Sequence, residues 1–268
     1  MIESYIAIYE NLKTIVSRLC GILNSNEREH PKGRKPILSN SEAITCALFW
    51  RKENIGSKQG LHDILKPSCS YNRFVVALNR IGIHLARVSA ALLQCAAKMA
   101  HPVKFTDSTD IPVCLNKNGK AHRTMRGLAE WSKTGKGWFY GLKLHLSGDA
   151  KGAVLALRLT PGNSDDRSVF RKMNERLRGL FIADAGYISE ELARAFFIER
   201  ERLLLTGSRA NMKKVATPFQ IALLNLRMRV EIHFRVLKVC YGLVTSLPRS
   251  IDGYLTHYLA AIAAYLLA

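Results

Sequence analysis

The sequence predicts an α/β fold: a mixed sheet flanked by helices, preceded by an all-helical N-terminal module. Two stretches of different periodicity carry this prediction. Apolar residues recur at helical spacing up to about residue 100, and short runs typical of strands follow. Hydrophobic residues make up 48% of the 268 residues, which is enough for a packed core and too many for a disordered chain. We therefore expect a helical module over residues 1–100 and a second domain over residues 101–268.

The N-terminal module is predicted to consist of helices joined by polar connectors. Helices are expected over Ile2–Leu23, from Ser39, from Ser70 and over Ile83–Ala100. Ser39 and Glu42 have the spacing of a capping box. A basic linker is predicted over His30–Pro36. Helix pairs with basic connectors dock on DNA or serve in packing and dimerisation, and no recognition helix stands out, so both roles stay open.

The second part of the chain alternates strands and helices. Strands are predicted over Val103–Thr106, Trp138–Ser147, Ala153–Thr160, Gly179–Asp184 and Arg202–Thr206. Asp149–Gly152 is expected to be a hairpin turn. Helices are predicted over Ser189–Arg200 and Phe219–Val239, and the apolar Tyr258–Ala268 is predicted to be a core helix, too short to span a bilayer. Three strands followed by alternating helix and strand are the order of an RNase H-like fold.

The chain is strongly basic and contains six cysteines. Lys and Arg number 40 against 21 Asp and Glu, a net charge of +19, which favours an extended polyanion such as nucleic acid as partner. An exposed basic surface without a specific role is the alternative. The cysteines are scattered and form no Cys-x-x-Cys pair, so we expect reduced core residues, with neither a disulfide framework nor a zinc site. The N-terminus lacks the pattern of a secretory signal.

Three acidic residues are the candidates for chemistry. Asp107 and Asp184 are predicted at the ends of buried strands, and Glu231 lies in a predicted helix. A sheet that brings the three together would offer only hard oxygen ligands, which suit a pair of Mg²⁺ ions and leave room for phosphate oxygens. Asp107 also has the strand parity of Val103 and Phe105, and a carboxylate on a core-facing parity is costly unless it is paired or binds metal.

Each candidate has a competing interpretation. Asp107 would instead cap a turn at its strand end, and Asp110 is near enough to replace it. Asp165 and Asp166 compete with Asp184, but they follow Pro-Gly-Asn, so helix capping is the better interpretation for both.

Glu231 shares a helical face with basic residues. Arg227, Arg235 and Lys238 stand four residues before, four after and seven after it, which keeps all of them on or near one face. An ordinary solvated, salt-bridged helix face gives the same pattern.

A basic segment with two tryptophans lies between the first two predicted strands. Basic residues interleaved with Gly and Trp suit a strand or loop that follows a phosphate backbone and stacks a base. Trp131 is the better stacking candidate, because Trp138 opens an apolar strand and is expected in the core. The residues expected to contact DNA here are Arg123, Arg126, Trp131, Lys133 and Lys136.

Several stretches of the chain match a known family. They are Pro67–Val75, Phe105–Thr109, Arg126–Ala129, Gly137–His145, Leu159–Arg167 and Asp184–Ser189. By these stretches the chain resembles the IS982 family of bacterial insertion-sequence transposases, within the wider group of DDE transposases with RNase H-like cores. The likeness runs over most of residues 35–268.

The resemblance implies that Asp107, Asp184 and Glu231 are a catalytic triad holding two Mg²⁺ ions, for which Mn²⁺ can substitute. The helix also matches the signature Arg-x3-Glu-x6-Lys, with Arg227 and Lys238 placing terminal DNA phosphates. Two positions depart from the family pattern. Such families usually carry Lys at the position of Ala185 and Tyr at that of Leu224.

The expected function is therefore cleavage of double-stranded insertion-sequence ends and transfer of the freed 3′-hydroxyl into target DNA. The in-line displacement would form no covalent protein–DNA intermediate, so Ser108 and Tyr187 would not act as nucleophiles. The resemblance implies a homodimer on DNA, in the bacterial cytoplasm with the nucleoid and without a membrane partner. An RNase H-like nuclease without strand transfer and a catalytically inactive DNA-binding protein are the alternatives.

Overall fold

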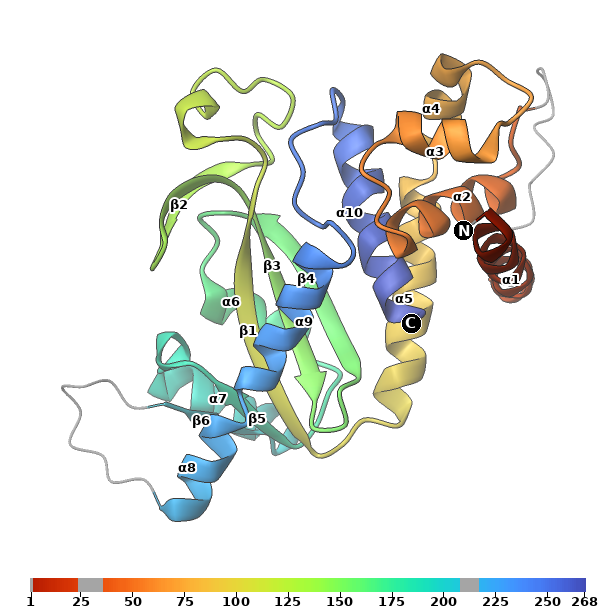
Figure 1. Ribbon diagram of the computed structural model, residues 1–268. Coiled ribbons are helices and arrows are strands. Elements are labelled where there is room, and N and C mark those ends of the chain that lie inside the picture. Colours follow the sequence, from red (N-terminus) through yellow and green to blue (C-terminus); the bar gives the residue numbers. More distant parts are fainter. Residues whose placement is uncertain (1, 24–35, 208–216) are drawn as a thin grey trace. The chain divides into compact units, whose positions relative to one another are not determined.

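The computed structural model describes residues 2–23, 36–207 and 217–268 (Figure 1). The chain forms two compact units. One contains Met1–Leu92 together with Val236–Ala268, and the other contains Leu93–Arg235. The functional division into residues 1–100 and 101–268 stays a prediction. The basic linker predicted over His30–Pro36 falls almost entirely outside the described residues.

The first unit is helical, as the sequence predicts. Its helices are α1 (Ile2–Ile22), α2 (Asn40–Lys52), α3 (Lys58–Leu65), α4 (Tyr71–Asn79), most of α5 (Gly82–Lys98) and α10 (Ile251–Leu266). The helix α2 is buried from Ala43 to Arg51 and contacts both α1 and α10. The predicted C-terminal core helix is confirmed, since α10 carries the fully buried Tyr254 and Tyr258. The short helix α3 was not predicted.

The predicted capping box at the start of α2 is present. The backbone N–H of Glu42 donates to Ser39 Oγ at 3.2 Å, and the backbone N–H of Ser39 donates to Glu42 Oε2 at 2.8 Å. Two of the orphan N–H groups at this helix end are thereby satisfied.

The second unit is built on a mixed sheet, which confirms the predicted fold class. Its strands are β1 (Val103–Pro112), β2 (Glu130–Thr134), β3 (Gly137–Asp149), β4 (Val154–Pro161), β5 (Leu180–Ala183) and β6 (Leu203–Thr206). β3 is antiparallel to β1, β2 and β4, whereas β5 runs parallel to both β1 and β6. β2 and β4 pair with successive parts of the same side of β3, β2 with residues 137–141 and β4 with residues 142–148. Across the sheet the order is therefore β4-β3-β1-β5-β6, with β2 taking the place of β4 beside the first residues of β3.

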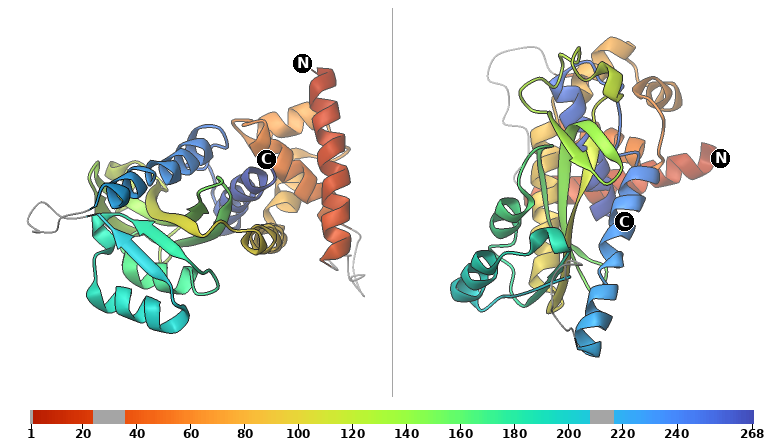
Figure 2. Two further views of the ribbon diagram at one scale, coloured as in Figure 1. Left: turned by 90° about the horizontal axis from the view of Figure 1, so that it is seen from below. Right: turned by 90° about the vertical axis from the view of Figure 1, so that its left-hand side faces the viewer.

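Helices cover both faces of this sheet (Figure 2). α6 (Asp166–Met173) and α7 (Glu190–Arg200) lie on one face and α9 (Met228–Val239) on the other, while α8 (Pro218–Asn225) contacts β5 and β6. Under α6 and α7, a cluster of buried aromatic rings forms the core. Its rings are Phe170, Phe181, Tyr187 and Phe196, with neighbouring centroids 4.9–5.9 Å apart.

The structure corrects three local predictions. β1 continues to Pro112, because β3 pairs with it over that whole length, so Asp107 is not at a strand end. β2 is an additional strand. The helix predicted over Phe219–Val239 is two helices, since the backbone between Asn225 and Met228 closes tighter turns, such as Arg227 N–H to Leu224 O at 3.1 Å.

The cysteines are all free thiols, and two of them lie outside the core. Cys20 and Cys46 are buried as predicted, but Cys95 and Cys240 are exposed, so the prediction of core positions is wrong for these two. Among the described residues, no single helix is long and apolar enough to cross a membrane; the bent pair α4–α5 passes a test of length and composition alone.

Candidate active site

Asp107 and Asp184 come together because β1 and β5 are parallel neighbours. The last register pair between the two strands is Thr106 with Ala183, and the two aspartates directly follow it. The backbone of Asp184 remains extended, with φ −69° and ψ 167°. Residues at the same register position of parallel strands point to the same face, with strands about 4.8 Å apart. The two carboxylates therefore lie side by side on one face of the sheet.

Asp107 is the first residue of β1 beyond its parallel neighbour. β5 ends at Ala183, whereas the pairing of β1 with β3 continues, with Asp107 opposite the buried Leu146. Its side chain is 20% exposed, and the backbone N–H of Ser108 donates to Oδ1 at 2.8 Å. Asp184 is exposed and makes no side-chain cap hydrogen bond to the short helix that follows it. The exposed Asp184 carboxylate thus remains accessible where β5 ends beside β1.

Arg227 links Asp107 to Glu231. Its guanidinium donates to Asp107 Oδ2 at 3.0 Å, and its second terminal nitrogen lies 3.6 Å from Glu231 Oε1. Glu231 is in the first turn of α9, where a carboxylate is favoured by the helix dipole. Arg227 therefore connects Glu231 to Asp107, although Arg227 and Asp107 are 120 positions apart in the sequence.

The environment of Asp107 disfavours its charged form. The pKa of Asp107 is raised to about 6, chiefly by burial and to a lesser extent by the nearby Asp184 and Glu231, against the opposing effects of the Ser108 N–H and Arg227. The contribution of both acids shows that the three carboxylates share one region of negative potential. One guanidinium does not neutralise three carboxylates, so the site retains an attraction for cations.

The donor set fits a divalent metal by its chemistry. All three groups are carboxylates, the oxygen ligands that Mg²⁺ and Mn²⁺ prefer. As the side chains lie, no group of three His, Cys, Asp or Glu residues in the described parts of the chain is arranged as a metal site. Arg227 is placed where it pairs with two of the three acids, so a cation that binds Asp107 and Glu231 would replace its guanidinium.

The competing acids have other partners or another orientation. Asp165 caps α6, as predicted, by accepting from the Ser168 N–H at 2.9 Å. Asp166 pairs with Lys143 Nζ at 3.2 Å. Asp110 stands three residues after Asp107 on the same strand, which turns it to the opposite face.

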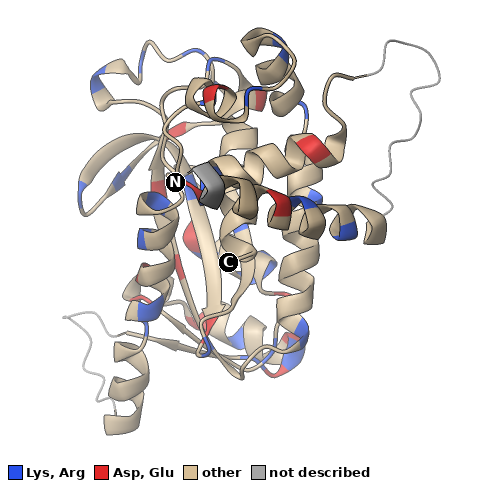
Figure 3. Ribbon diagram, turned by 45° about the vertical axis from the view of Figure 1, so that its right-hand side comes forward, with Lys and Arg blue, Asp and Glu red and all other residues tan. Residues whose placement is uncertain are grey.

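The other predicted DNA-contacting residues lie on two segments. Arg123 and Arg126 are exposed before β2, Lys133 on β2 and Lys136 in the turn after it. Arg235 is exposed on α9, whereas Lys238 in the last turn of α9 is half-buried. Figure 3 marks the Lys and Arg positions in blue.

The structure contradicts the prediction for one of the two tryptophans. Trp131 is half-buried, with its ring centroid 5.5 Å from that of Tyr140. Trp138 is 58% exposed, so the prediction that it is a core residue is wrong. This exposure depends on the strand pairing, because β1 pairs with β3 only from Gly141 onward and residues 137–140 have no strand partner on the β1 side.

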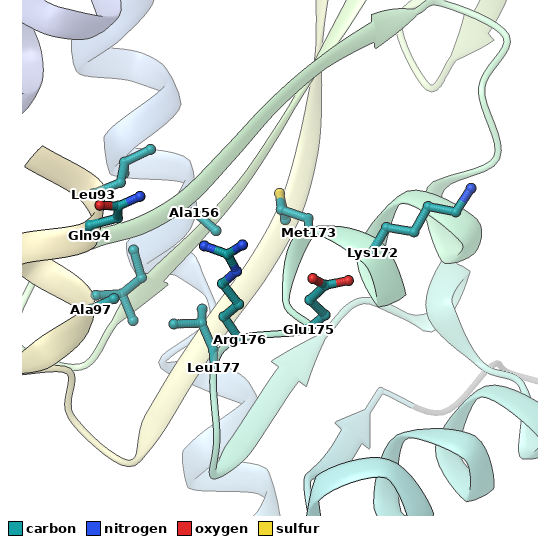
Figure 4. A pocket seen from close by; sticks show the side chains of 10 residues that line it. Leu93, Gln94, Ala97, Ala156, Lys172, Met173, Glu175, Arg176 and Leu177 are labelled. Atoms are coloured by element: carbon teal, nitrogen blue, oxygen red, sulfur yellow. The ribbon is translucent and has the colours of Figure 1, made fainter. Parts of the chain in front are cut away.

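A cavity elsewhere in the second unit contains none of the predicted site residues (Figure 4). It has a volume of about 180 Å³ and is lined by residues of α5, β4, α6 and the segment after α6. Its walls are mainly apolar, with Lys172, Glu175 and Arg176 among the lining residues. The acids therefore lie outside this cavity, beside the point where β5 ends.

The family follows from the segment that carries these acids. The model of a transposase DDE domain matches residues 97–250, which include Asp107, Asp184 and Glu231. The chain belongs to the transposase DDE domain family. A DDE transposase acts on DNA, and transposase DDE domains generally use divalent metal ions. Comparisons with curated proteins and with solved structures give no match.

Proposed function

We propose that this transposase cleaves double-stranded DNA at the ends of an insertion sequence and joins the freed 3′-hydroxyl to target DNA, as the IS982 family does. The observation that carries the proposal is the register of β1 on β5. It puts Asp107 and Asp184 beside each other just beyond Thr106 and Ala183, within reach of the Arg227–Glu231 pair.

Asp107, Asp184 and Glu231 are proposed to hold two Mg²⁺ ions, with Mn²⁺ as a substitute. When bound, such a pair activates the attacking oxygen and stabilises the leaving oxygen of an in-line displacement. The three carboxylates would hold these cations, and Arg227, which pairs with Asp107 and Glu231 in the structure, would then be available to a DNA phosphate. Neither Ser108 nor Tyr187 is required as a nucleophile, and Tyr187 is buried in the aromatic core.

Basic side chains are proposed to hold the DNA backbone around the acids. Arg123, Arg126, Lys133, Lys136, Arg227, Arg235 and Lys238, together with Trp131, form the proposed contact set. With a chain charge of +19, binding should weaken steeply as salt rises. Residues 1–100 are proposed to serve DNA binding or dimerisation and residues 101–268 catalysis, in a homodimer that holds two ends in the nucleoid.

The first test is cleavage of a duplex that carries the element's own end, with Mg²⁺ and with EDTA, by the wild type and by Asp184→Asn. Cleavage that requires metal and is lost in the variant supports the proposal. The variant should bind DNA as well as or better than the wild type, because a negative charge near phosphate is removed. Asp165→Asn is the matched control, since the Asp165 carboxylate caps α6 and pairs with Arg167, and its loss should leave cleavage intact.

Strand transfer separates the transposase from its alternatives. A pre-cut end with a free 3′-hydroxyl should be joined to a target plasmid. Cleavage without joining would instead identify a nuclease. Tight DNA binding by the wild type without any metal-dependent cleavage would refute the enzymatic proposal for this chain.

A further inference from the structure

β2 and the first residues of β3 form an arm that extends past the rest of the sheet. β1 pairs with β3 only from Gly141 onward and β4 only from Leu142 onward. Residues 137–140 of β3 therefore have β2 as their strand partner (Figure 1). A two-stranded ribbon has no core of its own to bury side chains.

One face of this arm carries an aromatic row. Trp131 stands opposite Tyr140, and Lys133 stands opposite Trp138. Directly opposed residues point to the same face, and so do residues two apart on one strand, so all four side chains share a face. The row begins at the base of the arm and ends at Trp138, close to the turn that contains Lys136.

The base of the row is covered and its end is open. A Cβ on Gly119 would lie 2.4 Å from Trp131 Cζ2, so the chain before β2 passes directly over that ring. His122 also contacts the Tyr140 ring edge to face, with centroids 6.0 Å apart. Trp138 remains 58% exposed, and Asn116 holds its backbone by donating to its carbonyl oxygen at 2.6 Å. The indole is thus exposed on a backbone that is fixed.

The surroundings of Trp138 are basic. Between Cys114 and Trp138 the chain contains six Lys and Arg residues, all exposed, against the single acid Glu130; they are Lys117, Lys120, Arg123, Arg126, Lys133 and Lys136. An exposed indole among cations matches nucleic acid, because the cations bind phosphates while the ring stacks on a base. An acidic patch on a protein would pair with the cations but would offer no aromatic ring on which the indole could stack.

We propose that Trp138 is a stacking site for an unpaired DNA base. On DNA, the flat face of an indole stacks on the face of a base, whereas paired bases within a duplex show only their edges in the grooves. The base would lie on Trp138 at the end of the aromatic row, with its phosphates near Lys133 and Lys136. This inference rests on the proposed function, because it assumes that the basic arm binds DNA.

The test is equilibrium binding of two DNAs by Trp138→Ala and Trp138→Phe. One DNA is a blunt duplex, and the other is the same duplex with a short unpaired 3′ extension that contains 2-aminopurine. Trp138→Ala should weaken binding of the extended duplex by about tenfold and leave the blunt duplex unchanged. Trp138→Phe should retain most of the affinity, and quenching of 2-aminopurine should be seen with the wild type and lost with Trp138→Ala.

Phe197→Ala is the matched control, since Phe197 is an exposed ring (53%) on α7 of the same unit. It should change neither binding nor quenching. Equal binding of both DNAs by the wild type and Trp138→Ala would overturn the stacking site while leaving DNA binding intact. A change in sedimentation of Trp138→Ala without DNA would also overturn it, by showing a contact between copies. No binding of either DNA by the wild type would refute the proposed function itself.

Discussion

The buried charge of Asp107 gives a pH dependence that can be calculated. Its carboxyl has a pKa of about 6 in the folded protein against an ordinary 3.8. The folded protein therefore binds one more proton than the unfolded chain between these values, and its stability falls as pH rises from about 4 to about 6. Above pH 7 the charged carboxylate lowers the free energy of unfolding by about 3 kcal/mol relative to a neutral group. Asp107→Asn keeps a neutral side chain at every pH and should remove this cost.

The assay is urea unfolding of the wild type and Asp107→Asn at pH 4.5 and pH 7.5, in EDTA. From pH 4.5 to 7.5 the free energy of unfolding of the wild type should fall by about 2 kcal/mol relative to that of the variant. Mn²⁺ should reverse the effect at pH 7.5 in the wild type alone, because a metal binds the deprotonated carboxylate. Parallel pH dependence of the two proteins in EDTA would refute the argument that Asp107 is held in a desolvated, negative site.

Three further changes have defined outcomes. Arg227→Gln removes the cation that pairs with Asp107 and Glu231. Calorimetry should therefore show that Mn²⁺ binds this variant about tenfold more tightly than the wild type. Unchanged or weaker binding would show that Arg227 does not compete with metal. Gly179→Ala should lower the free energy of chemical unfolding by about 2 kcal/mol or more. The reason is that φ of Gly179 is +103° and the new Cβ would lie 2.3 Å from Pro102 O. An unchanged free energy would contradict this close approach. Ser39→Ala should cost about 1 kcal/mol in the same measurement by removing the α2 cap, whereas Ser39→Asp should be nearly neutral, and equal losses in both would exclude the cap as the cause.

Features set by neighbouring residues could be predicted from the sequence. The cap at Ser39 and Glu42 depends on a spacing within one helical turn, and the strand runs depend on alternation within a few residues. The hairpin at Asp149–Gly152 is of the same kind, because Asp149 Oδ1 accepts from the backbone N–H groups of Lys151 and Ala153. In each case the deciding hydrogen bonds join residues a few positions apart.

Features set by pairing across the chain could not be predicted. The polar residues at the end of β1 favour a turn when only the local sequence is considered. They form a strand because β3 pairs with them as far as Pro112. The exposure of Trp138 depends on where that pairing stops. The contact of Arg227 with Asp107 joins segments whose proximity depends on the whole sheet. The three acids could be chosen as candidates from their predicted elements, whereas their role as a catalytic triad comes from the family resemblance and stays a prediction.

The alignment of β1 with β5 has a consequence for how such a transposase loses activity. Val103 pairs with Leu180, and each strand then reaches its aspartate after the same number of residues. The loss of one codon inside either strand would keep every acid in the protein and turn one carboxylate to the wrong side of the sheet. Under the proposed function, a genomic copy damaged in this way would look intact by its acidic residues. Equal strand lengths before the two aspartates would be the better mark of a working copy.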